Sequence, residues 1–340
     1  MTLIVGTPHW NGICLNSDTR VTNSANGKYK DNAQKIAHIH GGIGMVASKD
    51  RLSAILLRET IRRRLDSFIA TNQKFDSSSD LTVITELLII SAMKDTRNHD
   101  LHNHRPIYDT DSEGLIGITI PDQKLRLNNK ECENLLSILT NGSQGLPVDK
   151  LFVNKYIHQF IDCTNGNIQF VEFSEFPCNT LYKYKLKLYD DKSYDIYKLQ
   201  KVPFGQIEAM GSGSAFDYSS KRDRVLFFVL FSGKYNDVGG GALHLSMIHE
   251  FAEQLAPKHK VFNIKTFGGA IVPGVINTLP NGNGNTAIIE CRLSSKSKKK
   301  ATISKTYHIG NDLWVTTRSG DNIKLDPFPD TVDIQGGMFW

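Results

Sequence analysis

The order of strand and helix patterns in the first 95 residues is the feature that most limits the folds open to this chain. β-Forming residues run over 2–6 and 11–18 with an Asn-Gly turn signal between them, which predicts a hairpin. Residues 35–39 and 43–47 predict a second pair of strands. We therefore expect two hairpins, followed by helices that cover a sheet.

Two helices are predicted next. Apolar residues recur at helical spacing from Leu52 to Ile69 and again from Leu81 to Ile90. Ser48 is the predicted N-cap of the first helix, and Asp50 suits its first turn.

The remainder of the chain predicts a mixture of elements whose order in the middle stays open. Strands are expected at 115–120, 168–173, 180–188, 194–199, 261–264, 270–276, 286–292 and 313–317. Helices are expected at 133–139, 148–160, 225–231 and 243–255, the last ended by Pro257, and residues 295–300 read as a basic loop.

Composition indicates a globular chain in a reducing compartment. The hydrophobic fraction is 40%, the charged fraction is 22% and the net charge is only +5, so neither a membrane span nor a nucleic-acid partner is predicted. The five cysteines are widely spaced and contain no CxxC, which favours reduced thiols over a zinc site. The N-terminus lacks a secretory pattern, so we expect a cytoplasmic protein.

The N-terminus carries the strongest chemical signal. Removal of Met1 would leave Thr2 with a free α-amine, which joins a hydroxyl nucleophile and a base in one residue. Asp18 ends the second predicted strand and Lys35 opens the third, so an acid and an ammonium can lie beside Thr2. Lys28 or Lys30 could compete with Lys35, and Thr2 could be an ordinary strand residue.

These residues, taken in order, carry a family resemblance. Thr2, Ser17–Thr22, Lys35-Ile36, Gly44–Asp50 and Gly211–Ser214 together resemble the proteasome β-type subunits and the peptidase subunit of the bacterial ATP-dependent two-component protease. Both are N-terminal nucleophile (Ntn) hydrolases. The resemblance implies an α+β fold, a four-layer αββα sandwich. Taken alone, Gly211–Ser214 would be a turn rather than a phosphate-binding loop, because it lacks the lysine of a P-loop.

The resemblance also implies a role for each matched residue. Thr2 would be the nucleophile, Asp18 and Lys35 the charge pair that activates it, and Arg20 a support for that pair. The backbone N–H of Ser48 would stabilise the oxyanion, where the family usually has glycine, and the Ser212 hydroxyl would bind the threonine amine. The implied activity is that of a threonine peptidase without cofactor or metal, acting on peptides or unfolded proteins. The implied partners are copies of the chain in a ring and an ATPase.

The resemblance is uneven along the chain. It implies an Ntn hydrolase domain over residues 2–292 with an insertion at about 96–200, and a β-rich extension over 293–340. The spacing of Asp18 and Lys35 is one residue longer than in the family. The Asp-x-x-Ser-Gly-Gly element of the family is incomplete. Residues 264–269 lack its aspartate and serine, whereas 237–241 keep an aspartate but precede a helix.

Three alternatives stay open. The chain could be a non-catalytic scaffold or assembly subunit, or an Ntn amidase for small molecules. His99, His102 and His104, with Asp100 and Asp109, have a spacing that could bind a metal, although a polar surface loop is the simpler interpretation.

Overall fold

The computed structural model describes residues 2–22, 26–71, 81–98, 111–146, 158–159, 161–162, 165, 170–187, 197–231, 237–255, 268–278, 284–294, 297–308, 314–316 and 321–328. The fold is mixed α+β with several sheets. The predicted strand at 261–264, most of the predicted helix at 148–160 and the histidine-rich segment 99–109 lie outside the described residues.

The larger sheet joins the first two strands of the chain to four strands from its second half. Its strand order is β10-β1-β2-β11-β12-β13, and every neighbouring pair is antiparallel. The bounds are β1 Leu3–His9, β2 Gly12–Asp18, β10 Glu208–Gly211, β11 Ile271–Thr278, β12 Gly284–Ser294 and β13 Ser297–His308. The predicted first hairpin is confirmed as β1 and β2.

The smaller sheet has the order β5-β6-β7-β8-β9. Its bounds are β5 Ile36–His40, β6 Ile43–Lys49, β7 Asp111–Asn128, β8 Phe170–Lys187 and β9 Tyr197–Val202. The second predicted hairpin is confirmed as β5 and β6. β8 is one long strand where two were expected, because it pairs with β7 along both halves. Since β7, β8 and β9 are three of the five strands, these segments contribute directly to the core.

Two small sheets and several helices complete the described fold. The small sheets pair β3 (Val21–Thr22) with β4 (Tyr29–Lys30) and β14 (Trp314–Thr316) with β15 (Asn322–Lys324). The helices are α1 Arg51–Thr71, α2 Leu81–Asn98, α3 Asn129–Ser137, α5 Ser219–Phe231, α6 Val238–Leu245 and α7 Met247–Leu255. A π-helical turn (Ile138–Gly142) follows α3, and a 3-10 turn (Ser212–Ala215) follows β10.

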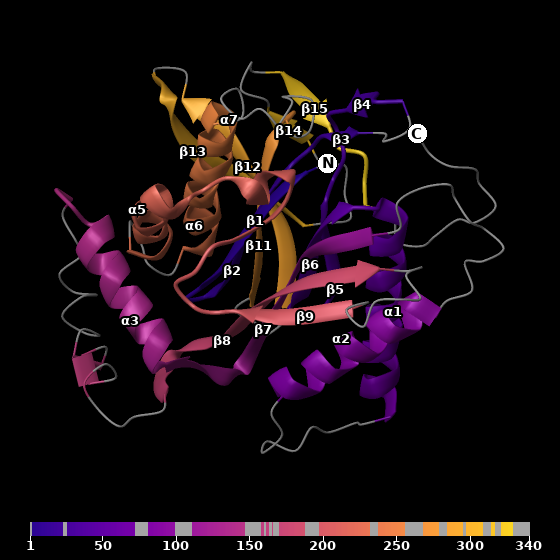
Figure 1. The fold of residues 1–340 in the computed structure, drawn as a ribbon, viewed down its shortest axis with the longest axis horizontal. Helices are drawn as coiled ribbons and strands as arrows, with labels where there is room; N and C mark the ends of the chain where they lie inside the picture. The colour runs from indigo at the N-terminus through magenta and orange to yellow at the C-terminus, as the bar shows by residue number, and fades with distance from the viewer. Residues whose placement is uncertain are drawn as a thin grey trace.

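The buried apolar residues form three clusters that separate the elements into layers. One cluster joins α1 and α2 to the five-stranded sheet through Ile61, Ile89 and Ile116. A second joins α5, α6 and α7 to the six-stranded sheet. The third lies between the sheets and includes Ile4 and Leu115. Figure 1 accordingly shows α1 and α2 on one side of the molecule and α5 and α6 on the other, with both sheets between them.

The start of α1 differs from the sequence expectation. Ser48 does not cap the helix, because it lies in β6 and its hydroxyl donates to Glu113. Lys49 ends that strand with φ 64°. Asp50 is the cap: its Oδ2 accepts the Ser53 N–H at 2.8 Å.

Two later predictions are also corrected. The single helix at 243–255 is interrupted at Ser246, whose hydroxyl donates to the Leu243 carbonyl at 2.5 Å and so competes with the helical ladder. The basic loop at 295–300 is wrong from Ser297 onward, where β13 begins. β13 is at the edge of its sheet, where lysine is well tolerated. The boundary between residues 292 and 293 falls inside β12.

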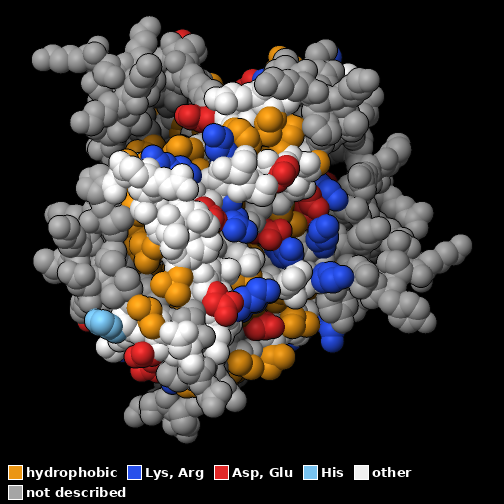
Figure 2. Space-filling model, turned by 60° about the vertical axis from the view of Figure 1, so that its left-hand side comes forward, with side chains coloured by type: hydrophobic (Ala, Val, Ile, Leu, Met, Phe, Trp, Pro, Cys, Tyr) orange, Lys and Arg blue, Asp and Glu red, His pale blue; other side chains and the backbone are white. Residues whose placement is uncertain are grey.

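The surface and the thiols agree with the composition. On the face seen in Figure 2, basic and acidic side chains are interspersed with hydrophobic ones. Cys14, Cys132 and Cys178 are not in disulfides. Over the described ranges, the helices include none long and apolar enough to cross a membrane.

Candidate active site

Lys35 is the centre of a buried polar cluster beside the first residue of β1. Its Nζ donates to Thr2 Oγ1 at 2.7 Å, to Asp18 Oδ1 at 2.7 Å and to the Arg20 carbonyl at 2.5 Å. The Lys35 and Asp18 side chains are 6% and 2% exposed. The structure therefore brings together the three residues that the sequence placed on separate strands. Lys28 and Lys30 are exposed, which excludes both as competitors in this conformation.

The contacts of Lys35 Nζ are those that an ammonium makes. An ammonium has three N–H donors and no acceptor, and all three donors have acceptors here. Burial lowers the pKa of Lys35, and the Asp18 carboxylate opposes that shift. In this form Lys35 has no lone pair to accept the Thr2 proton, but its charge can stabilise an alkoxide at Oγ1.

Asp18 is held in place by backbone donors on both oxygens. Oδ1 also accepts the Leu3 N–H at 3.1 Å, and Oδ2 accepts the Gly268 N–H at 3.0 Å. Gly268 thus brings the end of segment 264–269 to the site, although the segment lacks the expected aspartate and serine. The alternative segment has another function: Asp237 caps α6 by accepting the Gly240 N–H at 3.1 Å.

Arg20 supports the cluster through its backbone and a fixed side chain. Its carbonyl accepts from Lys35. Its guanidinium binds both oxygens of Asp31, at 2.6 and 2.8 Å, and lies 4.0 Å from the centre of the Tyr29 ring. The hydrogen bond to Asp31 raises the pKa of Arg20. This bidentate ion pair fixes the segment whose carbonyl positions Lys35.

The Gly211-Ser212 turn contacts Thr2 from the opposite side. β10 pairs with β1 up to Leu3 and Gly211, and the Ser212 N–H then donates to the Thr2 carbonyl at 2.8 Å. The Ser212 hydroxyl oxygen is buried and has no hydrogen-bond partner within the described part of the chain. Ser212 therefore contacts Thr2 through its backbone N–H, and the expected hydrogen bond between its hydroxyl and the Thr2 amine stays a prediction.

Strand geometry gives Ser48 a different place from the one expected. The Ala47 N–H donates to the Lys35 carbonyl at 3.2 Å, toward β5. Successive N–H groups of a strand point to opposite edges, so the Ser48 N–H points toward β7, where Ser48 is paired with Glu113. The next N–H on the β5 side is that of Lys49.

Sequence reasoning missed Glu113. Its carboxylate accepts the Gly211 N–H at 3.1 Å and the Ser48 hydroxyl at 3.4 Å, and it pairs with Lys49 Nζ at 3.2 Å. The sequence shows only an acidic residue at the start of an apolar strand. That pattern does not indicate which residues the carboxylate binds.

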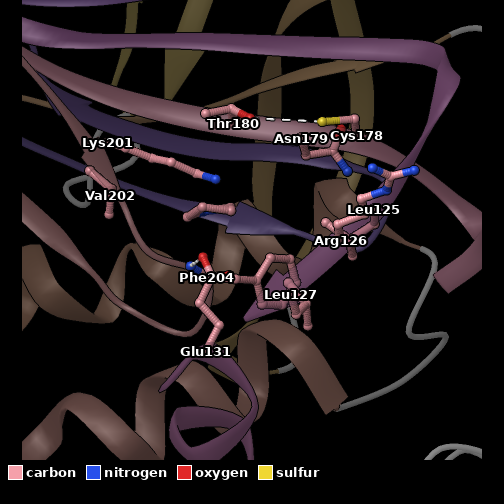
Figure 3. Close-up of a pocket in the computed structure, with 11 residues that line it drawn as sticks. Leu125, Arg126, Leu127, Glu131, Cys178, Asn179, Thr180, Lys201, Val202 and Phe204 are labelled. Carbon is pink, nitrogen blue, oxygen red and sulfur yellow. Dashed lines mark hydrogen bonds between the residues drawn. The ribbon is translucent and has the colours of Figure 1, made fainter. Parts of the chain in front are cut away.

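A small hollow lies elsewhere, between β1, β7, α3, β8 and β9 (Figure 3). Its volume of about 20 Å³ suits a single water molecule. Glu131, Cys178 and Lys201 line it, and Glu131 Oε1 accepts the Phe204 N–H at 2.9 Å. No residue of the Thr2 cluster lines this hollow.

The described residues contain no group of three or more histidine, cysteine, aspartate or glutamate side chains that could bind a metal. His99, His102 and His104 lie outside them. No family model and no curated protein matches this chain.

Proposed function

We propose that the chain is an N-terminal threonine hydrolase that cleaves peptide bonds through an acyl-enzyme on Thr2. The observation that carries this proposal is the 2.7 Å hydrogen bond from Lys35 Nζ to Thr2 Oγ1, with the same ammonium held by Asp18 at 2.7 Å. A buried ammonium in contact with a threonine hydroxyl lowers the free energy of the alkoxide. This arrangement favours a catalytic role over the scaffold alternative.

The reaction follows from the residues in contact with Thr2. Removal of Met1 frees the Thr2 α-amine, which accepts the Oγ1 proton directly or through water. Oγ1 attacks the substrate carbonyl, the scissile C–N bond breaks and the leaving amine takes the proton. The resulting ester on Oγ1 is hydrolysed by water, which restores the hydroxyl. Lys35 stays protonated throughout and stabilises the charge on Oγ1.

The oxyanion donor in this proposal is the Lys49 N–H in place of the Ser48 N–H. Lys49 shares the strand edge of Ala47, whose N–H points toward Lys35. Its φ of 64° is a conformation that glycine favours, and glycine is the residue that the resembled family has at the oxyanion position. Ser212 supplies the acceptor for the freed amine, since its buried hydroxyl otherwise has no partner among the described residues.

The fold and the resemblance extend the proposal. Helices on the outer faces of two facing sheets support a four-layer αββα Ntn sandwich. By the same resemblance, we propose peptide or unfolded-protein substrates, a cytoplasmic location, a ring of identical chains and an ATPase partner. Size-exclusion chromatography with light scattering tests the ring, and a monomer at working concentration would exclude it.

The decisive experiment is intact mass spectrometry after incubation with a peptide epoxyketone, a reagent that needs a hydroxyl and a free α-amine on one residue. We expect loss of Met1 and a one-to-one adduct on Thr2 that is absent in Thr2→Ala. If Met1 is absent and no adduct forms, peptide hydrolysis is wrong. A panel of small amides then separates an amidase, which turns them over, from a scaffold, which does not.

A further inference from the structure

Glu113 is a buried carboxylate that the proposed chemistry does not use. Its side chain is 9% exposed, yet it lies where three segments meet: the end of β6, the start of β7 and the end of β10. Oε1 accepts from Gly211 N–H and Ser48 Oγ, while Oε2 pairs with Lys49. A buried carboxylate is costly unless its oxygens have donors, and this one binds donors from both neighbouring segments.

The first of these donors controls the turn against Thr2. Gly211 has φ 81° and ψ −162°, and the strand pairing of β1 with β10 ends at this residue. Beyond it, the Ser212 N–H bonds the Thr2 carbonyl, and the Ser212 hydroxyl lies buried without a partner among the described residues. Because the Glu113 carboxylate accepts the Gly211 N–H, it fixes the peptide plane from which this turn starts.

The other two donors come from the end of β6. Ser48 and Lys49 end β6, and Lys49 has a positive φ that a side chain with a Cβ rarely adopts. The ion pair with Glu113 holds the Lys49 side chain, which is 42% exposed at this strand end. One carboxylate thus binds the side chains of Ser48 and Lys49 at the end of β6 and the backbone N–H at the start of the Gly211-Ser212 turn.

We infer that Glu113 is a positioning residue for the reaction at Thr2: it clamps the β6 end, which carries the oxyanion donor, to the turn that binds the Thr2 carbonyl. This inference rests on the proposed function for its kinetic consequence. Misplacement of groups by about 1 Å can cost a hundredfold in rate, so a clamp that touches no substrate can still set the rate constant.

The test compares Glu113→Gln with Glu208→Gln. Glu208 is on the same strand as Gly211 and pairs with Lys183 at 3.1 Å, but it does not bind the Gly211 N–H. For peptide hydrolysis we expect Glu113→Gln to lower kcat by about tenfold to a hundredfold with KM unchanged. The rising limb of its pH profile should move to lower pH, because loss of a nearby negative charge lowers the pKa of the Thr2 amine. Glu208→Gln should match the wild type.

Two measurements keep the inference separate from the proposed function. Hydrogen exchange of the Gly211 amide should be faster in Glu113→Leu, which has no acceptor for that N–H, and unchanged in Glu208→Leu. In protein from which Met1 has been removed, NMR titration of Glu113→Gln should show a lowered pKa for the Thr2 amine. If the wild type forms no adduct, the proposed function fails, and the exchange of the Gly211 amide still decides whether Glu113 holds the turn. Wild-type exchange and an unshifted amine pKa would overturn it, as would wild-type kcat with an unchanged pH profile. If Glu113→Gln does not fold, Lys49→Gln should produce the kcat loss to a smaller degree.

Discussion

A Cβ added to Gly211 would overlap the carbonyl oxygen of Thr2. The two atoms would lie far inside van der Waals contact, so the residue before Ser212 must be glycine for the turn to contact Thr2 in this way. The φ of 81° at Gly211 also favours glycine, because residues with a Cβ rarely adopt a positive φ. The backbone of this turn is therefore as specific to the site as the side chains of Asp18 and Lys35.

Gly211→Ala is expected to abolish adduct formation at Thr2. It should also destabilise the protein by more than the same substitution at a glycine of positive φ where an added Cβ meets no other atom. Gly27→Ala is the matched control, because Gly27 has φ 67° and an added β-carbon there would meet nothing within 4 Å. The control should cost about 1 kcal/mol and leave the adduct intact. Urea unfolding and intact mass measure the two effects. Equal destabilisation in both variants would contradict the close contact.

Thr2→Ser should keep the acyl-transfer chemistry, and Thr2→Ala should lose it by about a thousandfold or more. Serine retains both the hydroxyl that accepts from Lys35 and the α-amine, whereas alanine retains only the amine. Both residues are small, so Met1 removal should be the same. The rate of peptide hydrolysis measures the difference, and intact mass shows whether Met1 has been removed. Activity of Thr2→Ala equal to that of the wild type would exclude Thr2 as the nucleophile.

Lys35→Met should abolish activity and cost about 3 to 5 kcal/mol in the free energy of unfolding, because it leaves the buried Asp18 carboxylate without its ammonium. The double variant Asp18→Asn with Lys35→Met removes both charges. It should recover much of the stability and none of the activity. Denaturant unfolding and the adduct assay give both values. Recovery of activity in the double variant would show that the ion pair serves only the fold.

The free energy of unfolding should fall as the pH decreases below about 6.5, the ordinary pKa of a histidine side chain. Burial lowers the pKa of His9 from 6.5 to about 4, and its side chain is fully buried. The unfolded chain then binds a proton before the folded chain does, so stability is full above 6.5 and is lost toward 4. From about pH 7 to about pH 4.5, the wild type should lose about 2 to 3 kcal/mol relative to His9→Gln. Parallel pH dependence in the two proteins would contradict this assignment.

Local patterns were sufficient for most individual elements. β-Forming residues with an Asn-Gly turn predicted the first hairpin, and the pattern at 35–47 predicted the second. Apolar spacing predicted α1 and α2, because neighbours in sequence decide which face of a helix is apolar. Boundaries depended on competing contacts. Ser48 failed as an N-cap because its hydroxyl donates to Glu113, a residue far away in the sequence.

The amino-acid sequence was enough to name the residues of the candidate site and their order. Thr2, Asp18 and Lys35 could be named because each opens or ends a predicted strand, and Arg20 and Ser212 because of the family resemblance. The pairing across the sheets left Lys28 and Lys30 exposed and buried Lys35, which the strand pattern had already favoured. It also turned the Ser48 N–H toward β7 and brought Glu113 to Gly211. The reason is physical. Burial, strand register and the pairing of charges across sheets depend on residues distant in the chain, and no local pattern records them.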